Sequence, residues 1–196
     1  MAMSGMDIQS LLMIAVLVCI PISLSVFIIR RRMNRTIDAR IRAASKHLLH
    51  DFLLPDGNEG EIHFEYALLT PMGILVVDTK DIEGNVFGSD AMDDWTVIND
   101  HRRHTFSNPQ RGLLDRIAAI KAFADVVPVE GYVAFTDSAR FSKGQPSMVV
   151  FFDTLIDELN GSLSDKSISA VDAFLPTWDL LVSQATVKGV AKALIE

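Results

Sequence analysis

The chain has 196 residues, a formal net charge of −7 and a hydrophobic content of 49%, which suit one ordinary domain with an appendage. Its single cysteine, Cys19, excludes an intrachain disulfide framework and a cysteine-based zinc site, and it agrees with a reducing compartment. Residues 47–196 carry a net charge of −12, which argues against a generic nucleic-acid binder, because phosphate binding is mainly electrostatic.

An apolar segment without a formal charge occupies residues 11–29. As a helix it would be roughly 28 Å long, close to the hydrocarbon thickness of a bilayer. Pro21 is expected to kink this helix, and nearby serines can satisfy the freed backbone groups. The sequence therefore predicts a single transmembrane anchor over residues 8–30.

Basic residues follow the apolar segment, and residues 30–46 carry a net charge of +6. By the positive-inside rule, this predicts an inner or plasma membrane protein with its N-terminus outside and its domain cytoplasmic. Residues 31–46 are expected to form a basic juxtamembrane linker or helix beside anionic head groups. A cleaved signal peptide is the alternative, but no Lys or Arg precedes Arg30 and residues 26–35 offer no small-residue cleavage site.

Residues 47–196 are predicted to form one α/β domain. The hairpin within it has the strongest signal, because β-branched and aromatic residues flank a Pro/Gly turn. The elements expected in the first half are a strand at 47–55, a turn at 56–60, hairpin strands at 62–69 and 74–80 around a turn at 70–73, a loop at 81–94 and a strand at 95–100.

A helix is predicted over residues 108–125, where Asn108 can act as the cap and Pro109 suits the first turn. Apolar residues recur along it at helical spacing, namely Leu113, Leu114, Ile117, Ile120 and Phe123. The elements expected after it are strands at 131–137 and 147–153, a helix at 153–160, and one or two helices in 168–196 interrupted at Pro176. The order of elements indicates a mixed sheet flanked by helices.

The hairpin brings charged residues together if its loop has an even length. A loop centred between Pro71 and Met72 pairs residues whose numbers sum to 143, so that Glu65 lies opposite Asp78 and His63 opposite Lys80. Opposed residues point to the same face with Cβ atoms ~4.5–5.5 Å apart. An odd-length loop would shift the register by one residue and separate these groups.

Two carboxylates at this distance repel unless a cation lies between them, and oxygen ligands suit Mg²⁺. An adjacent lysine could orient an attacking water or stabilise charge on a phosphate. Glu65, Asp78 and Lys80 are therefore candidates for metal-assisted phosphodiester hydrolysis. The alternative is that the two acids are solvated strand residues and Lys80 forms an ordinary cross-strand ion pair.

The stretch from about residue 47 to 141 resembles the nuclease-related domain (NERD) family, a branch of the PD-(D/E)xK restriction-endonuclease-like superfamily. The similar segments are LLHDFLLPDG, HFEYALLTPMGILVVDTKDIEG, Trp95, HRRHTFSNPQR and GYVAFTDSARF. The resemblance implies a restriction-endonuclease-like fold in which Glu65 and Asp78 hold Mg²⁺ or Mn²⁺ and Lys80 is the catalytic lysine. Three departures from the family pattern stand out: the two acids are exchanged, an upstream Gly-Glu pair is absent, and Gly112 replaces a glutamine.

Basic residues gather around the start of the predicted helix 108–125. Arg102, Arg103 and Arg111 are candidates for nucleic-acid binding, and Arg116 lies further along the same helix. A helix N-terminus with nearby cations can hold phosphate. The alternative is a solvated loop whose charges offset neighbouring acids.

Two functions from different classes follow. The first is a membrane-anchored, metal-dependent nuclease-like protein that hydrolyses phosphodiesters in DNA or RNA. The second is a catalytically inactive module of the same family that acts as a membrane-tethered interaction protein, with other proteins at the inner membrane as partners. The charge of −12 and the exchanged acids favour the second.

Overall fold

The computed structural model describes residues 36–56, 60–100, 102–124, 126–162 and 165–187. The chain divides into two units, Met1–Ala43 and Ala44–Glu196. In the first unit, residues 36–43 form a helix in which Arg42 Nε donates to Asp38 Oδ2 at 3.1 Å. The predicted anchor at residues 8–30 lies outside the described residues. Within the ranges that the structure describes, no helix is both long and apolar enough to span a bilayer.

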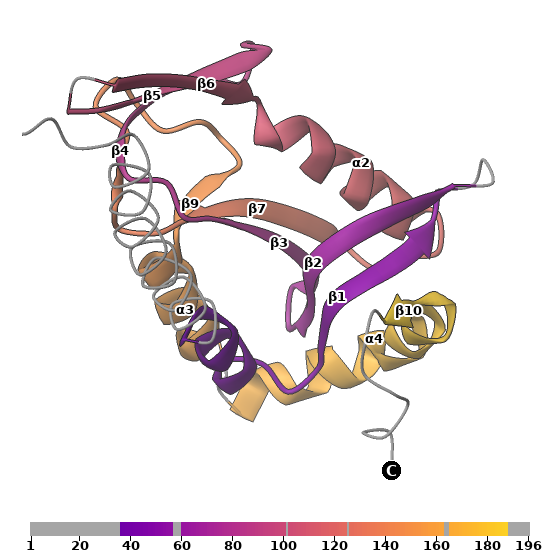
Figure 1. The fold of residues 1–196 in the computed structure, drawn as a ribbon. Helices are drawn as coiled ribbons and strands as arrows, with labels where there is room; N and C mark the ends of the chain where they lie inside the picture. The colour runs from indigo at the N-terminus through magenta and orange to yellow at the C-terminus, as the bar shows by residue number, and fades with distance from the viewer. Residues whose placement is uncertain (1–35, 57–59, 101, 125, 163–164, 188–196) are drawn as a thin grey trace, which may run out of the picture. The chain divides into compact units, whose positions relative to one another are not determined.

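The larger sheet of the second unit is mixed, and its strand order is β10-β1-β2-β3-β7-β9. Neighbours from β10 to β3 are antiparallel, whereas β3, β7 and β9 run parallel (Figure 1). These strands are β1 (Leu48–Pro55), β2 (Glu61–Thr70), β3 (Gly73–Lys80), β7 (Val129–Phe135), β9 (Val149–Phe151) and β10 (Thr186–Val187). The mixed α/β fold expected from the sequence is therefore confirmed.

A second sheet of four strands, in the order β6-β5-β4-β8, was not predicted. It consists of β4 (Gly84–Phe87), β5 (Asp94–Asn99), β6 (Arg102–Ser107) and β8 (Ala139–Arg140). The predicted loop at 81–94 is wrong where it contains β4. The reading of residues 102–107 as a loop is also wrong, because they pair with β5 along their whole length. This strand has no apolar alternation, since all its residues but Phe106 are exposed, and its pairing comes from the neighbouring strand.

Helix α2 (Pro109–Lys121) confirms the predicted cap, because Asn108 Oδ1 accepts the Gln110 amide at 2.9 Å. The apolar residues on its buried face are Leu113, Ile117 and Ile120. Leu114, expected on that face, is 52% exposed. Adjacent helical residues differ by about 100° in direction, so Leu113 and Leu114 cannot share the inward position.

The first turn of α2 is fastened to the loop that precedes β5. Asn108 Nδ2 donates to the Met92 carbonyl at 2.8 Å, and Gln110 Nε2 donates to Asp90 Oδ1 at 3.0 Å. The same Asp90 oxygen accepts the Ser147 amide at 3.0 Å, which joins this corner to the segment before β9. The start of α2 is thus fixed by side-chain and backbone groups from three separate parts of the chain.

Two further helices are α3 (Phe152–Gly161) and α4 (Asp165–Gln184). The predicted interruption at Pro176 is wrong, because α4 continues through it. Proline removes one helical hydrogen bond, but Trp178 and Leu181 beyond it are buried in the core, and this burial holds the second half of the helix in place.

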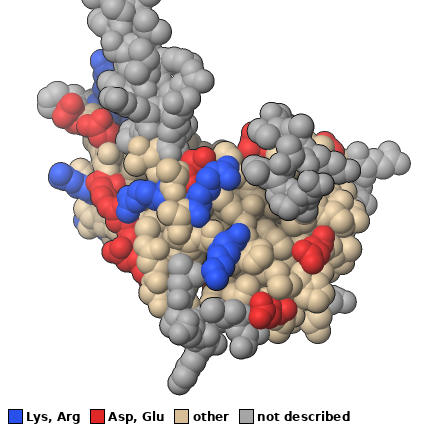
Figure 2. Space-filling model, turned by 90° about the horizontal axis from the view of Figure 1, so that it is seen from below, with Lys and Arg blue, Asp and Glu red and all other residues tan. Residues whose placement is uncertain are grey.

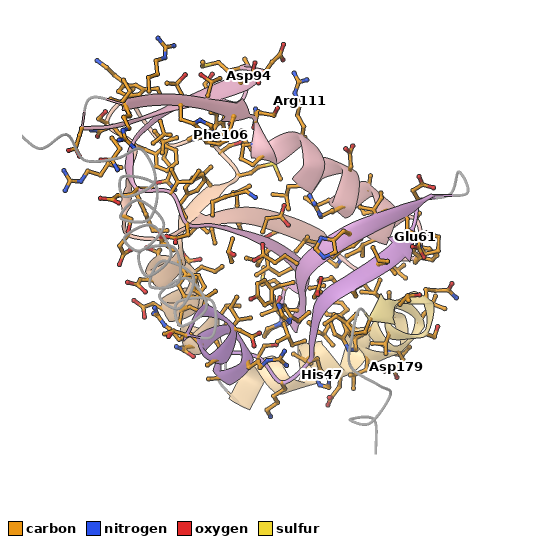
Figure 3. The ribbon with its side chains drawn as sticks, in the orientation of Figure 1. His47, Glu61, Asp94, Phe106, Arg111 and Asp179 are labelled. Carbon is orange, nitrogen blue, oxygen red and sulfur yellow. The ribbon has the colours of Figure 1, made fainter. Side chains whose placement is uncertain are left out.

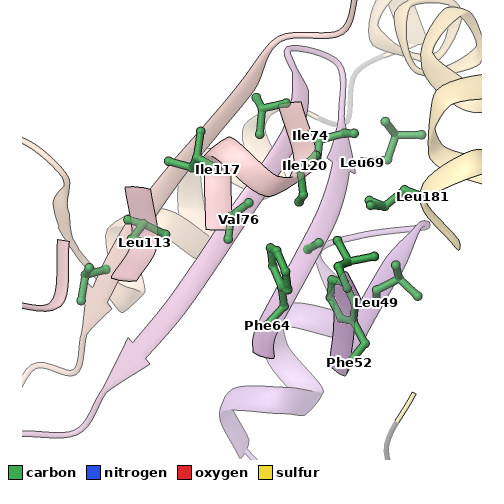
Figure 4. Packing of buried hydrophobic residues seen from close by; sticks show 14 of the residues in the cluster. Leu49, Phe52, Phe64, Leu69, Ile74, Val76, Leu113, Ile117, Ile120 and Leu181 are labelled. Carbon is green, nitrogen blue, oxygen red and sulfur yellow. The ribbon is translucent and has the colours of Figure 1, made fainter. Parts of the chain in front are cut away.

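The core of the second unit lies between the large sheet and its helices. Figure 1 shows α2 on one side of the strands and α4 on the other. In Figure 4, Leu113, Ile117 and Ile120 of α2 pack towards Ile74 and Val76 of β3. Helix α2 is therefore held directly over the strand that carries Asp78.

Gly73 sets the start of β3 and cannot easily be replaced. Its φ of +127° disfavours other residues, and an added Cβ would lie 2.1 Å from the Pro128 carbonyl oxygen. We expect Gly73→Ala to lower the free energy of unfolding by at least about 2 kcal/mol, measured by urea denaturation. Gly161→Ala is the matched control, since nothing lies within 4 Å of its added Cβ. Equal stability of the two variants would contradict this role for Gly73.

Candidate active site

The β2–β3 hairpin has the predicted register. The paired residues are Tyr66↔Val77, Ala67↔Val76, Leu68↔Leu75, Leu69↔Ile74 and Thr70↔Gly73, so each pair of numbers sums to 143. The paired residues of β2 and β3 end at Tyr66 and Val77, so Glu65 and Asp78 are the next residues along the two strands. There the Glu65 carboxylate takes the place of a backbone acceptor, because its Oε2 accepts the Thr79 amide at 2.6 Å.

Glu65 is partly buried and held by one residue of the opposite strand. Besides the amide, the Thr79 hydroxyl donates to Glu65 Oε1. Burial raises the pKa of Glu65, and the negative charge of Asp78 raises it further, whereas the Thr79 hydrogen bonds and the Lys80 ammonium lower it. Because Thr79 lies between Asp78 and Lys80 on β3, its hydrogen bonds bring Glu65 close to both of them.

Asp78 is the most deeply buried acid among the described residues, with 7% of its side chain exposed. Its Oδ2 accepts a hydrogen bond from Arg116 Nη1 at 3.0 Å, and within the described part of the chain its buried Oδ1 has no hydrogen-bond partner. Burial raises the pKa of Asp78, and the positive charges of Arg116, Lys80 and His63 oppose that rise. A carboxylate with one unsatisfied buried oxygen can still accept a hydrogen bond or a cation there.

Arg116 reaches the hairpin from α2 and contacts both of its strands. Its Nε donates to the His63 carbonyl on β2 at 2.6 Å, while Nη1 binds Asp78 on β3. The sequence placed Arg116 only near a phosphate-binding patch. The spacing of Gly112 and Arg116 is a sequence signal that the two residues are in contact. Gly112 lies one helical turn before Arg116, and a Cβ at Gly112 would be 3.0 Å from Arg116 Nη1.

A cleft of ≈ 600 Å³ opens between α2 and the start of β2, and Arg116 forms part of its wall. Three acids, Asp56, Glu61 and Asp115, also line it. Arg116 is the sole basic side chain among its described lining residues. The guanidinium therefore separates an acidic cleft from the buried carboxylate of Asp78.

A histidine–aspartate pair beside the acids was not predicted. His63 Nε2 and Asp51 Oδ1 are 2.6 Å apart, and both side chains are about half exposed. Asp51 has a φ of +52°, uncommon for a residue within a strand. No local sequence pattern predicts this backbone conformation, although the predicted register put His63 on the same face as Glu65.

The three arginines predicted to bind nucleic acid are exposed but do not form one surface. Arg102 and Arg103 are neighbours on β6, so their side chains point to opposite faces of that strand. Arg111 forms an ion pair with Asp93 and projects from the start of α2 away from β2 and β3 (Figure 3). Figure 2 draws the molecule from below, away from Arg111, and the basic side chains on that face are interspersed with acidic ones.

A divalent metal would have two protein carboxylates here. Among the described residues, no group of three or more His, Cys, Asp or Glu is placed to hold a metal ion. Mg²⁺ needs fewer protein ligands than most ions, because it keeps several waters and often uses only one or two carboxylates plus substrate oxygens. The unpartnered Asp78 Oδ1 and the neighbouring Glu65 fit that requirement.

Comparison with protein families gave one match, in which the model of the nuclease-related domain (NERD) aligns with residues 30–136. That range contains β1–β6, α2 and β7, and so all the residues of the hairpin site. Searches of curated proteins and of solved structures returned no match.

Thr79 is expected to stabilise the site by fixing Glu65. Thr79→Val keeps the side-chain shape and removes the hydroxyl donor, so we expect a loss of about 1–2 kcal/mol in the free energy of unfolding at pH 7 without divalent metal. Thr105→Val on the exposed strand β6 is the control, with an expected change within about 0.5 kcal/mol. Equal losses in urea denaturation of the two variants would show that the Thr79 hydroxyl does not support Glu65.

Proposed function

The chain belongs to the NERD family, and on that premise we propose that it is a metal-dependent, nuclease-like protein that hydrolyses phosphodiester bonds in nucleic acid. Glu65 and Asp78 would hold Mg²⁺ or Mn²⁺. Lys80 would orient the attacking water. All three residues lie on the β2–β3 hairpin.

One observation supports it above the others: Asp78 presents a buried carboxylate oxygen without a hydrogen-bond partner in the described part of the chain, beside a second carboxylate and a lysine. A purely structural acid at this depth would be expected to have both oxygens satisfied. A divalent cation bound at Asp78 Oδ1 would supply the missing partner.

A bound divalent ion would supply Lewis-acid polarisation of a phosphoryl oxygen and a water of lowered pKa. The protein's own groups have separate roles. Thr79 holds the Glu65 carboxylate in place through two hydrogen bonds. Lys80, whose charge acts on both acids, can hold a water by hydrogen bonding and stabilise negative charge that develops on the phosphate.

We further propose that Arg102, Arg103 and Arg111 meet phosphates away from the reacting one. Their exposure suits backbone contacts, which position a nucleic acid without reading its sequence. DNA and RNA are both candidate substrates, because contacts of this kind are present in either.

A second candidate function is an inactive NERD module that acts as an interaction protein. It is favoured by Arg116, which already gives Asp78 a positive partner without a metal. The net charge of −12 over residues 47–196 points the same way.

We also propose that residues 8–30 anchor the chain in the inner or plasma membrane, with the N-terminus outside and the catalytic unit in the cytoplasm. The proposal rests on the apolar run and the basic residues that follow it. Substrate or protein partners would then be met near the inner membrane surface.

The nuclease proposal is tested with full-length protein, DNA and RNA, with and without Mg²⁺ or Mn²⁺. We expect metal-dependent cleavage that falls at least about 100-fold in Lys80→Ala and in Asp78→Asn. Lys143→Ala removes an exposed lysine outside the hairpin and should cleave like the parent. Cleavage that persists in Lys80→Ala would overturn the assignment. Absence of cleavage, with no metal binding that Asp78→Asn abolishes, would favour the inactive module.

The anchor is tested by fractionating cells that express the full chain. We expect the protein to stay in the membrane pellet after an alkaline carbonate wash, because ~19 buried apolar residues bind far more strongly than a surface contact. Deletion of residues 8–30 should move it to the supernatant. A mature N-terminus located after residue 30 by mass spectrometry would instead demonstrate cleavage.

A further inference from the structure

Arg116 lies beside the carboxylate of Asp78 that would hold the metal, and it already binds one of the two oxygens, Oδ2. Its guanidinium is anchored on both hairpin strands, by the His63 carbonyl and by Asp78 Oδ2, and only 22% of its side chain is exposed. An arginine between two acceptors in a partly buried site makes strong, charge-assisted hydrogen bonds. Arg116 is therefore a fixed part of the site.

Gly112 creates the space in which this guanidinium lies. A Cβ at position 112 would lie 3.0 Å from Arg116 Nη1, so the guanidinium would have to shift by a few tenths of an ångström to accommodate it. Glycine is unfavourable within a helix by ~1 kcal/mol relative to alanine, so a mid-helix glycine calls for a packing reason. The guanidinium of Arg116 supplies that reason, because, apart from the adjacent residues and the helix backbone, its atoms are the ones that an added Cβ would meet within 4 Å.

We propose that Arg116 is an internal counter-cation that competes with the divalent metal for Asp78, and that Gly112 makes this competition possible. The inference rests on the metal site of the proposed function. A doubly charged ion at Asp78 repels the guanidinium, so metal entry must weaken or break the Arg116–Asp78 ion pair. Arg116 then turns towards the cleft that it already lines.

The competition sets the state of the site. Without metal, Arg116 neutralises Asp78 and keeps a buried charge from standing alone. With metal, the released guanidinium is the one described basic group of the acidic cleft, and so it can take a phosphate there. The Arg116–Asp78 ion pair therefore persists until the metal concentration is high or a substrate phosphate binds the guanidinium.

Metal titration calorimetry of the full-length protein with Mn²⁺ and Mg²⁺ tests the proposal. Arg116→Gln should bind the metal about tenfold more tightly than the parent, a gain of ~1.4 kcal/mol. Lys121→Gln removes the same charge from an exposed position on α2 and should leave the affinity unchanged. Unchanged or weaker binding in Arg116→Gln would overturn the proposal, since the ion could then bind Asp78 Oδ1 while Arg116 stays on Oδ2.

Gly112→Leu provides a second variant that keeps every charge. Leucine favours the helix, carries no atom that binds a hard cation, and has a Cβ that crowds the guanidinium and should weaken its hold on Asp78. It should also tighten metal binding and should increase the rise in unfolding temperature that Mn²⁺ causes. Failure of both variants to tighten binding would overturn the inference even if Arg116→Gln folds poorly.

The same titrations separate this inference from the nuclease proposal. Tighter metal binding in both variants without cleavage by any of them would support the competition and overturn the nuclease function. Metal-dependent cleavage by the parent, together with unchanged affinity in the variants, would support the nuclease function and overturn the competition.

Discussion

A carboxylate as deeply buried as Asp78 needs positive charge nearby, and this requirement organises the centre of the molecule. Water is largely excluded from it, so the protein supplies Arg116 from a helix and Lys80 from the same strand. Glu65 adds a second negative charge close by, which increases the demand. Helix α2 brings Arg116 to Asp78, Gly112 leaves space beside the guanidinium, and the hairpin holds Lys80 on the same strand as Asp78.

The same requirement links the two candidate functions. In an enzyme of this type, a metal ion neutralises the buried acid. In an inactive module, a residue of the protein itself neutralises it. Asp78 has features of both, since one of its oxygens binds Arg116 and the other has no partner among the described residues. On the proposals made above, the strength of the Arg116–Asp78 contact decides which of the two functions the site can serve.

The hairpin could be predicted from the sequence because its register follows from turn length and a period of two, both of which are local. The pairing around 143 and the cap at Asn108 were predicted for this reason. Strand β6 could not be predicted, because its polar residues pair only through a neighbouring strand. The contact between Arg116 and Asp78 joins residues 38 positions apart, and nothing local specifies it.

The fastening of the first turn of α2 has a consequence for the rest of the helix. Asn108 and Gln110 fix both where the helix starts and how it is rotated about its axis. Arg116 follows Asn108 by two turns, or ~12 Å, so its direction is inherited from that corner. Inserting or deleting a single residue between them would swing the guanidinium by about 100° and shift it by ~1.5 Å. Asp90, which binds Gln110 at the start of the helix, thereby helps to orient the guanidinium of Arg116.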